Sequence, residues 1–173
     1  MTPLIEGQPI IVVMGVSGSG KSTIAAGLAD ELGWDFEDGD NLHSDENVAK
    51  MSAGIPLDDA DRQPWLETIS SWIVEHEMAG VPGVITCSAL KRRYRDVLRE
   101  RDVVFVHLAG SRGLIGDRLT QRSDHYMPPA LLDSQLDSLE PPEPSENAIT
   151  VNAEKTPAEE VAEIVAVLAL RRR

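Results

Sequence analysis

A glycine-rich loop follows the first apolar run of the chain. Gly15, Gly20, Lys21 and Ser22 fit the spacing G-x-x-x-x-G-K-[ST], directly after the β-branched segment PIIVVM at 9–14. A flexible Gly/Ser linker would give a similar composition, but it would not need a strand before it and a helical pattern after it. The sequence therefore predicts a strand–loop–helix unit whose backbone N–H groups converge on phosphate oxygens.

The residue types in this loop favour a nucleotide as the ligand. The Lys21 ammonium group is expected to reach the β and γ phosphates, and the Ser22 hydroxyl is expected to bind Mg²⁺. The residues expected to contact the nucleotide here are Gly15, Ser17, Gly18, Ser19, Gly20, Lys21, Ser22 and Thr23.

Strand and helix patterns alternate along the rest of the chain. Strands are expected at 9–14, 35–40, 83–89, 103–109 and 148–151. Helices are expected near 44–53, 64–79 (with Pro64 in the first turn), 91–100, 111–121, 129–138 and 157–170. Such alternation predicts an α/β fold of three layers, with a parallel sheet and helices on both faces. We expect one domain over 1–173, with its ligands at the carboxyl ends of the strands.

Charge and composition exclude several classes of partner. The net charge of −13 disfavours nucleic acids and anionic membranes, and no apolar run is long enough to span a bilayer. Positive charge is concentrated in KRRYRDVLRER at 91–101, and most of these arginines are expected on a solvated helix face. A single cysteine, Cys87, cannot form an intramolecular disulfide, so we expect a reducing cytoplasm.

The reaction class is indicated by a pair of carboxylates. The guanine-reading N-K-x-D element of GTPases is absent, and the later apolar strands lack the closing aspartate typical of motor ATPases. Asp38 and Asp40 instead flank Gly39, and an extended chain would point both carboxylates to the same side. One could hold Mg²⁺ through water while the other accepts a proton from an attacking hydroxyl, as a kinase requires. The alternative is a polar turn that closes a strand.

Longer motifs carry a family resemblance. DNLHSDENVAKMSAGIPLDDADRQPWL at 40–66, CSALKRRYRDVLR at 87–99 and RLTQRSDHYMPPALLDSQLDSLEPP at 118–142 together resemble the gluconokinase family. The resemblance implies a P-loop kinase-like fold with a mobile lid at about 122–131. It also implies transfer of the γ-phosphoryl group of ATP to the 6-hydroxyl of D-gluconate, giving 6-phospho-D-gluconate. Family members are commonly homodimers. Tyr126 in the lid and Asn152 in the adenine loop depart from the usual Phe and Asp.

The resemblance assigns roles around the carboxylate pair. Asp40 is expected to act as the base and Asp38 to hold Mg²⁺ with Ser22, although the two aspartates could exchange roles. Asp40, His43 and Ser88 are expected to contact gluconate hydroxyls. His43 could instead be a surface histidine at a helix start.

A gluconate carboxylate also needs a cation. Arg62 and Lys91 are the two possibilities, and the sequence does not choose between them. Arg62 could instead be a buried arginine that caps a helix.

Two arginines precede the predicted lid. Arg118 and Arg122 lie one turn apart on one helix face, just before the helix-breaking SDHYMPP. By similarity to small kinases, Arg118 would lie against adenine and Arg122 would act on the phosphates. The closed lid would exclude water and so prevent ATP hydrolysis. Asn152 is expected on the adenine side.

Two other functions are compatible with the motifs. The nearer one is a shikimate kinase or another kinase for a small hydroxyl substrate. The more distant one is a nucleotide-binding regulatory module without catalysis. The latter is disfavoured because the residues that transfer would need are all present: Lys21, Ser22, Asp38, Asp40 and Arg122.

Overall fold

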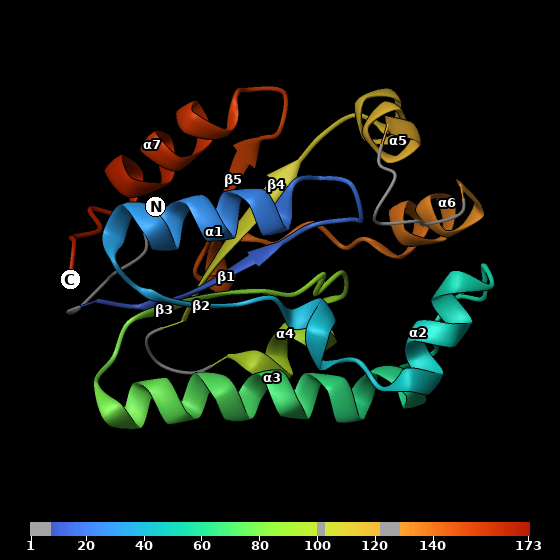
Figure 1. The fold of residues 1–173 in the computed structure, drawn as a ribbon, viewed down its shortest axis with the longest axis horizontal. Coiled ribbons are helices and arrows are strands. Elements are labelled where there is room, and N and C mark those ends of the chain that lie inside the picture. The colour runs from blue at the N-terminus through green and yellow to red at the C-terminus, as the bar shows by residue number, and fades with distance from the viewer. Residues whose placement is uncertain (1–7, 100–102, 122–128) are drawn as a thin grey trace.

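The computed structural model describes residues 8–99, 103–121 and 129–173, and it contains a parallel sheet between two layers of helices (Figure 1). The strands are β1 (Ile10–Met14), β2 (Asp35–Glu37), β3 (Gly83–Thr86), β4 (Val103–Ala109) and β5 (Ala148–Asn152). Their order in the sheet is β2-β3-β1-β4-β5, and every described pairing is parallel. This arrangement confirms the predicted α/β fold.

The helices are α1 (Lys21–Leu32), α2 (Asp45–Ser52), α3 (Asp59–Ala79), α4 (Arg92–Leu98), α5 (Arg112–Gln121), α6 (Pro129–Ser138) and α7 (Pro157–Val167). Two short 3₁₀ helices, η1 (Gly39–Leu42) and η2 (Pro144–Glu146), complete the described elements. No helix in the described part of the chain is long and apolar enough to cross a membrane.

Side-chain alternation along β1 divides the core between the two faces of the sheet. Ile11 and Val13 pack with α1 and α7 on one face. Ile10, Val12 and Met14 pack with α3 and α4 on the other. All five residues are buried, as expected for a central parallel strand that is covered on both sides.

Several predicted boundaries differ from the structure. β2 ends at Glu37, not at 40, because Asp38 caps η1 and turns the chain. β3 ends at Thr86, not at 89. α7 ends at Val167, not at 170, because Ala169 has a left-handed φ of 51°.

The start of α3 also differs from the prediction. A capping box between Asp58 and Asp61 begins this helix at Asp59, so Pro64 lies inside the helix and not in its first turn. Proline lacks the N–H that this position would donate to the preceding turn. The capping box supplies hydrogen bonds at the helix start that sequence periodicity did not reveal.

The loops that follow β1, β2 and β3 lie at one end of the sheet, toward α2, α5 and α6 (Figure 1). These are the carboxyl ends of the strands, where open parallel sheets bind their ligands. Hydrogen bonds join the three loops directly. Gly15 N donates to Ser88 O at 3.3 Å, and Gly39 N donates to Thr86 Oγ1 at 3.0 Å.

Candidate active site

The glycine-rich loop connects β1 to α1 and requires its glycines. Gly15, Gly18 and Gly20 have φ values of 150°, 82° and 98°. L side chains rarely adopt such values. A Cβ atom on Gly18 would also lie 2.9 Å from the Leu119 side chain. The backbone curl predicted for a phosphate-binding loop is therefore present.

Two serines of this loop make contacts within the protein. Ser19 is fully buried, its N–H donates to Val16 O, and its Oγ has no hydrogen-bond partner among the described residues. Ser17 N donates to the Gln135 side chain of α6 at 2.6 Å. These contacts fix the loop against its own turn and against α6.

Lys21 and Ser22 are the first two residues of α1. Lys21 Nζ donates to Val16 O at 3.1 Å, which holds the ammonium group over the loop. Ser22 Oγ donates to Asp38 Oδ2 at 2.7 Å. The helix start is thereby joined to the end of β2.

Asp38 is held as an ionised carboxylate. Its Oδ1 accepts from Thr86 Oγ1 at 2.9 Å and from Asp40 N at 3.0 Å. Burial alone would raise the pKa of Asp38, but hydrogen bonds from Ser22, Asp40 N and Thr86, with the charge of Lys21, hold it below its ordinary value.

The donor set at Ser22 and Asp38 fits Mg²⁺. One hydroxyl and one carboxylate supply the hard oxygen ligands that this ion prefers. The described residues contain no cluster of three or more His, Cys, Asp or Glu that could hold a metal by itself. Such a sparse set suits Mg²⁺ that is held mainly by phosphate and water.

Asp40 lies in a different environment from Asp38. The prediction of an extended chain through both aspartates is wrong, because Asp40 belongs to η1 and Asp38 is its N-cap. Asp40 is exposed, whereas Asp38 is half-buried and bonded to Ser22 and Thr86. The pair therefore combines a carboxylate fixed by the protein with one open to a ligand.

Thr86 and Gly39 are site residues that the sequence reasoning missed. Thr86 Oγ1 accepts from Gly39 N and donates to Asp38. A Cβ atom on Gly39 would lie 1.9 Å from Thr86 O, so only glycine fits between the two aspartates. Trp65 Nε1 donates to Gly39 O at 2.7 Å and anchors the same turn to α3. The sequence signal for this part of the site is the polar residue Thr86 at the end of the apolar strand β3.

His43 is half-buried and held by its neighbours, so it is not a surface histidine. Its ring stacks on Trp65 with centroids 4.0 Å apart. Asn47 Nδ2 donates to Asp61 O and lies 3.3 Å from His43 Nδ1. Since an amide nitrogen only donates, we infer that Nδ1 accepts and that the neutral ring carries its proton on Nε2. Burial lowers the pKa of His43, although Asp40 raises it in part.

Arg62 and Lys91 both lie near the Tyr94 ring. Their charged groups are 5.3 Å and 5.9 Å from its centroid. Arg62 Nη1 donates to Leu57 O at 2.6 Å, beside the start of α3, and to Tyr94 Oη at 3.2 Å. The Tyr94 hydroxyl donates to Asp59. Within the described residues, no ion pair engages Arg62 or Lys91.

A buried ion pair supports the turn that carries Ser88. Ala89 has a left-handed φ of 45°. Arg95 is fully buried, and its Nη1 donates to Ala89 O at 2.8 Å. Its Nε donates to Glu146 at 2.7 Å. Burial alone would raise the pKa of Glu146, but its hydrogen bonds with Arg95 lower it to about 2. The turn between Ser88 and Lys91 is thus fixed from inside the protein.

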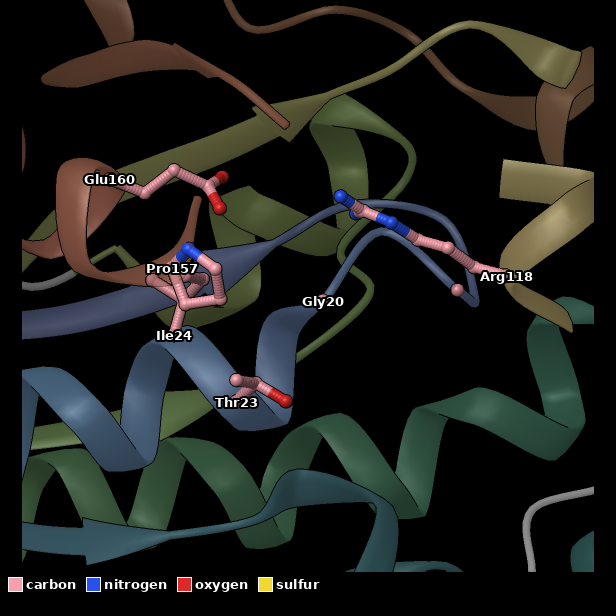
Figure 2. A pocket seen from close by; sticks show the side chains of 7 residues that line it. Gly20, Thr23, Ile24, Arg118, Pro157 and Glu160 are labelled. Atoms are coloured by element: carbon pink, nitrogen blue, oxygen red, sulfur yellow. The ribbon is translucent and has the colours of Figure 1, made fainter. Parts of the chain in front are cut away.

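A pocket of about 290 Å³ lies between the glycine-rich loop and the start of α7 (Figure 2). Its lining residues are Gly18, Gly20, Thr23, Ile24, Arg118, Pro157 and Glu160. The guanidinium group of Arg118 donates to Ala153 O at 2.6 Å and to Ser19 O at 3.3 Å. Arg118 therefore lies between the loop and the segment after β5, and its contact with adenine stays a prediction.

The sequence reasoning missed three residues of this pocket, Ile24, Pro157 and Glu160. Pro157 and Glu160 belong to the first turn of α7, which follows the capping residue Thr156. Asn152 does not line the pocket. Its Oδ1 accepts from Glu154 N at 2.8 Å and shapes the turn after β5. Arg122 and Tyr126 lie outside the described residues, as does most of the lid expected at 122–131.

Comparison with known proteins relates the chain to small-molecule kinases. The family model described as shikimate kinase matches residues 17–169. A gluconokinase of Gluconobacter oxydans is 54% identical over 149 residues, covering 85% of this chain and 84% of that protein. The thermosensitive gluconokinase of Escherichia coli is 45% identical over 140 residues, covering 80% and 75%.

Solved structures give the same relationship. A gluconokinase from Sinorhizobium meliloti matches with a TM-score of 0.85 and 44% identity, covering 95% of this chain and 94% of that one. A sugar kinase from a Janibacter species matches with a TM-score of 0.88 and 48% identity, covering 94% and 95%. The shikimate kinase of Aquifex aeolicus has a TM-score of 0.58 at 20% identity, covering 92% and 95%, and shares the fold.

Proposed function

This chain belongs to the shikimate kinase family and, within it, to the gluconokinases, and we propose that it phosphorylates D-gluconate at the 6-hydroxyl with ATP. One observation at the site carries the proposal. Asp38, which caps the η1 turn, bonds to Ser22 next to the phosphate loop, and the turn itself carries Asp40 and leads to His43. The His43 ring stacks on Trp65 of α3, the helix that also carries Arg62, so a carboxylate, an imidazole and a guanidinium come from adjoining elements. This set matches a substrate that has hydroxyls and one carboxylate.

On the nucleotide side, the loop and Lys21 bind the phosphates of ATP. Arg118 contacts the adenine, and Arg122, in the predicted lid, acts on the phosphates. Ser22 and Asp38 are the residues that would hold Mg²⁺. Bound there, the ion would neutralise charge on the β and γ phosphates.

On the acceptor side, Asp40 takes the proton of the gluconate 6-hydroxyl. The hydroxyl oxygen then bonds to the γ-phosphorus as the bond to the β-phosphate oxygen breaks, and ADP leaves. The exposed carboxylate of Asp40 suits this role, because the protein's own donors occupy both oxygens of Asp38.

The remaining contacts position gluconate. His43 Nε2–H donates to a substrate hydroxyl, and Ser88 contributes a second polar contact from the end of β3. Arg62 or Lys91 binds the carboxylate, since neither cation has a carboxylate partner in the described structure. A charge-assisted bond of this kind contributes about 1.5–3 kcal/mol.

Shikimate would offer a carboxylate and hydroxyls to the same groups. The named relatives favour gluconate, because gluconokinases are 40–54% identical to this chain, whereas the shikimate kinase structure is 20% identical. We also propose one domain over 1–173, a cytoplasmic location and a homodimer. The lone buried Cys87 supports the cytoplasm, and family resemblance supports the dimer.

A kinase assay coupled to ADP release tests the proposed function. The wild-type protein is supplied with Mg·ATP and, in turn, D-gluconate, other sugar acids, shikimate and nucleoside monophosphates. We expect the highest kcat/KM with D-gluconate and no turnover above background with nucleoside monophosphates. A preference for shikimate, or ADP release that is independent of every acceptor, would contradict the assignment.

A further inference from the structure

Glu160 places a buried carboxyl group at the pocket beside the glycine-rich loop. Its exposure is only 2%, yet it lines the pocket together with Arg118 and Pro157. Figure 2 shows the carboxyl group extending from α7 toward the side of the pocket where Arg118 lies. Its Oε1 has no hydrogen-bond partner among the described residues.

The neighbours of Glu160 do not satisfy this oxygen. The guanidinium of Arg118 donates to Ser19 O and Ala153 O, so it acts on Glu160 through charge alone. Lys155 is paired with Glu163. On α1, the pocket is lined by Thr23 and Ile24, which carry no charge.

A buried acceptor without a donor destabilises a protein unless a ligand supplies the donor. Burial and the charge of Glu163 raise the pKa of Glu160, the charges of Arg118 and Lys155 oppose the shift, and the net result is a pKa of about 7. The carboxyl group can therefore form a hydrogen bond with a polar group of a ligand that enters the pocket.

We propose that Glu160 selects the base of the nucleotide by accepting a hydrogen bond from the exocyclic 6-amino group of adenine. The inference rests on the proposed function only in placing the nucleotide base in this pocket. A 6-oxo purine would bring its carbonyl oxygen against the carboxylate, so two acceptors would face each other. Glu160 is thus a specificity-determining residue that distinguishes 6-amino from 6-oxo purine nucleotides.

ATP and ITP are the matched probes for this inference, because they share ribose and phosphates and their bases differ only at position 6 and the adjoining N1. Steady-state kinetics with saturating gluconate give the ratio of kcat/KM for ATP to that for ITP. In Glu160→Gln, the amide can accept from a 6-amino group or donate to a 6-oxo group. We expect the ratio to fall about ten- to hundredfold, as for loss of a charge-assisted hydrogen bond. Glu154→Gln removes the same charge from an exposed position nearby and should leave the ratio unchanged.

The pH dependence of this ratio supplies a second readout. Phosphate titration is common to both nucleotides and cancels, whereas ionisation of Glu160 improves acceptance from the 6-amino group and repels a 6-oxo group. The wild-type ratio should therefore rise between pH 6 and 8, and the Glu160→Gln ratio should stay level. A side chain that only supported α7 would not move this profile.

If thermal unfolding shows that the Gln variant folds poorly, Glu160→Met supplies an apolar side chain of similar length. This variant should lower kcat/KM for ATP more than kcat/KM for ITP. An unchanged ATP-to-ITP ratio in both variants, with gluconate still phosphorylated, would overturn the role of Glu160 and leave the proposed function intact. If wild-type protein fails to phosphorylate gluconate, the proposed function fails, and calorimetric dissociation constants for ATP and ITP decide the base selection separately. Equal constants in wild type would overturn it.

Discussion

Ser22 Oγ and Asp38 Oδ2 are joined by a hydrogen bond of 2.7 Å, which connects the first turn of α1 to the end of β2. Thr86 at the end of β3 bonds to the same carboxylate. One aspartate thus joins the first turn of α1 to the ends of β2 and β3. We infer that the proposed Mg²⁺ ligands are assembled before the nucleotide binds, because the protein's own donors already hold their orientation.

Lys21→Ala tests the phosphate loop. Turnover should fall by at least about a hundredfold, because the ammonium group stabilises charge on the transferred phosphoryl group. The circular dichroism spectrum should not change, since Lys21 contacts the loop and not the core. Lys155→Ala, which removes an exposed lysine paired with Glu163, should keep near-native turnover. A fully active Lys21→Ala would refute the phosphate-loop interpretation.

Asp38→Asn and Asp40→Asn should have different effects. Asp40→Asn should bind Mg·ATP normally and lose phosphoryl transfer, because an amide cannot accept the hydroxyl proton. Asp38→Asn should mainly raise the Mg²⁺ concentration required for half-maximal rate. Titrations of Mg²⁺ and ATP with each variant make the comparison. The reverse pattern would mean that the two roles are exchanged.

Arg62→Ala and Lys91→Ala identify the cation that binds the gluconate carboxylate. The variant that removes the carboxylate-binding cation should have a KM for gluconate about ten- to hundredfold higher, with little change in KM for ATP. Each variant is assayed with both substrates varied. Arg92→Ala, which removes an exposed arginine next to Lys91, serves as the control. If both variants lose ATP affinity and keep gluconate affinity, these cations serve the nucleotide.

Gly39→Ala should unfold more easily than the wild type. The added Cβ would lie 1.9 Å from Thr86 O, a backbone atom that cannot move without displacing β3. We expect a loss of at least about 3 kcal/mol in the free energy of unfolding, at the upper end for overpacked sites. Gly113→Ala in α5 has nothing within 4 Å and should be neutral or stabilising. Denaturant unfolding of both variants measures the difference, and equal stabilities would contradict the close approach of Gly39 to the Thr86 backbone.

Glu160→Gln should also change the pH dependence of stability. The pKa of Glu160 rises from 4.5 to about 7 on folding, so folding favours its neutral form. Stability from this group is complete below pH 4.5 and is lost as the pH rises toward 7. Relative to Glu160→Gln, the wild type should therefore lose unfolding free energy between pH 5 and pH 8. A constant difference between the two proteins would show that Glu160 ionises normally.

Local motifs were readable from the sequence where neighbouring residues determine the structure. The phosphate loop was one such case, because Gly15, Gly20, Lys21 and Ser22 carry its geometry within one short segment. The continuous apolar run of β1 was another, since a central parallel strand is buried on both faces. The succession of strands and helices along the chain also follows from periodicity, whereas the order of the strands within the sheet does not.

Other features depend on partners that are distant in the sequence. The turn at Asp40 is fixed by Asp38 and by Thr86, which lies 48 residues beyond Asp38. Glu160 meets the pocket only because α7 packs beside α1 in space. The start of α3 depends on the Asp58–Asp61 capping box, whereas Pro64 by itself predicts a later start.

The position of the new phosphate tests the proposed reaction most directly. Wild-type protein is incubated with D-gluconate and Mg·ATP, and the purified product is examined by phosphorus–proton correlation NMR. We predict one sugar-acid product whose phosphorus couples to the two protons on carbon 6, formed in equal amount with ADP. Inorganic phosphate in place of that product, or phosphorus coupled to another carbon's proton, would contradict the proposed reaction.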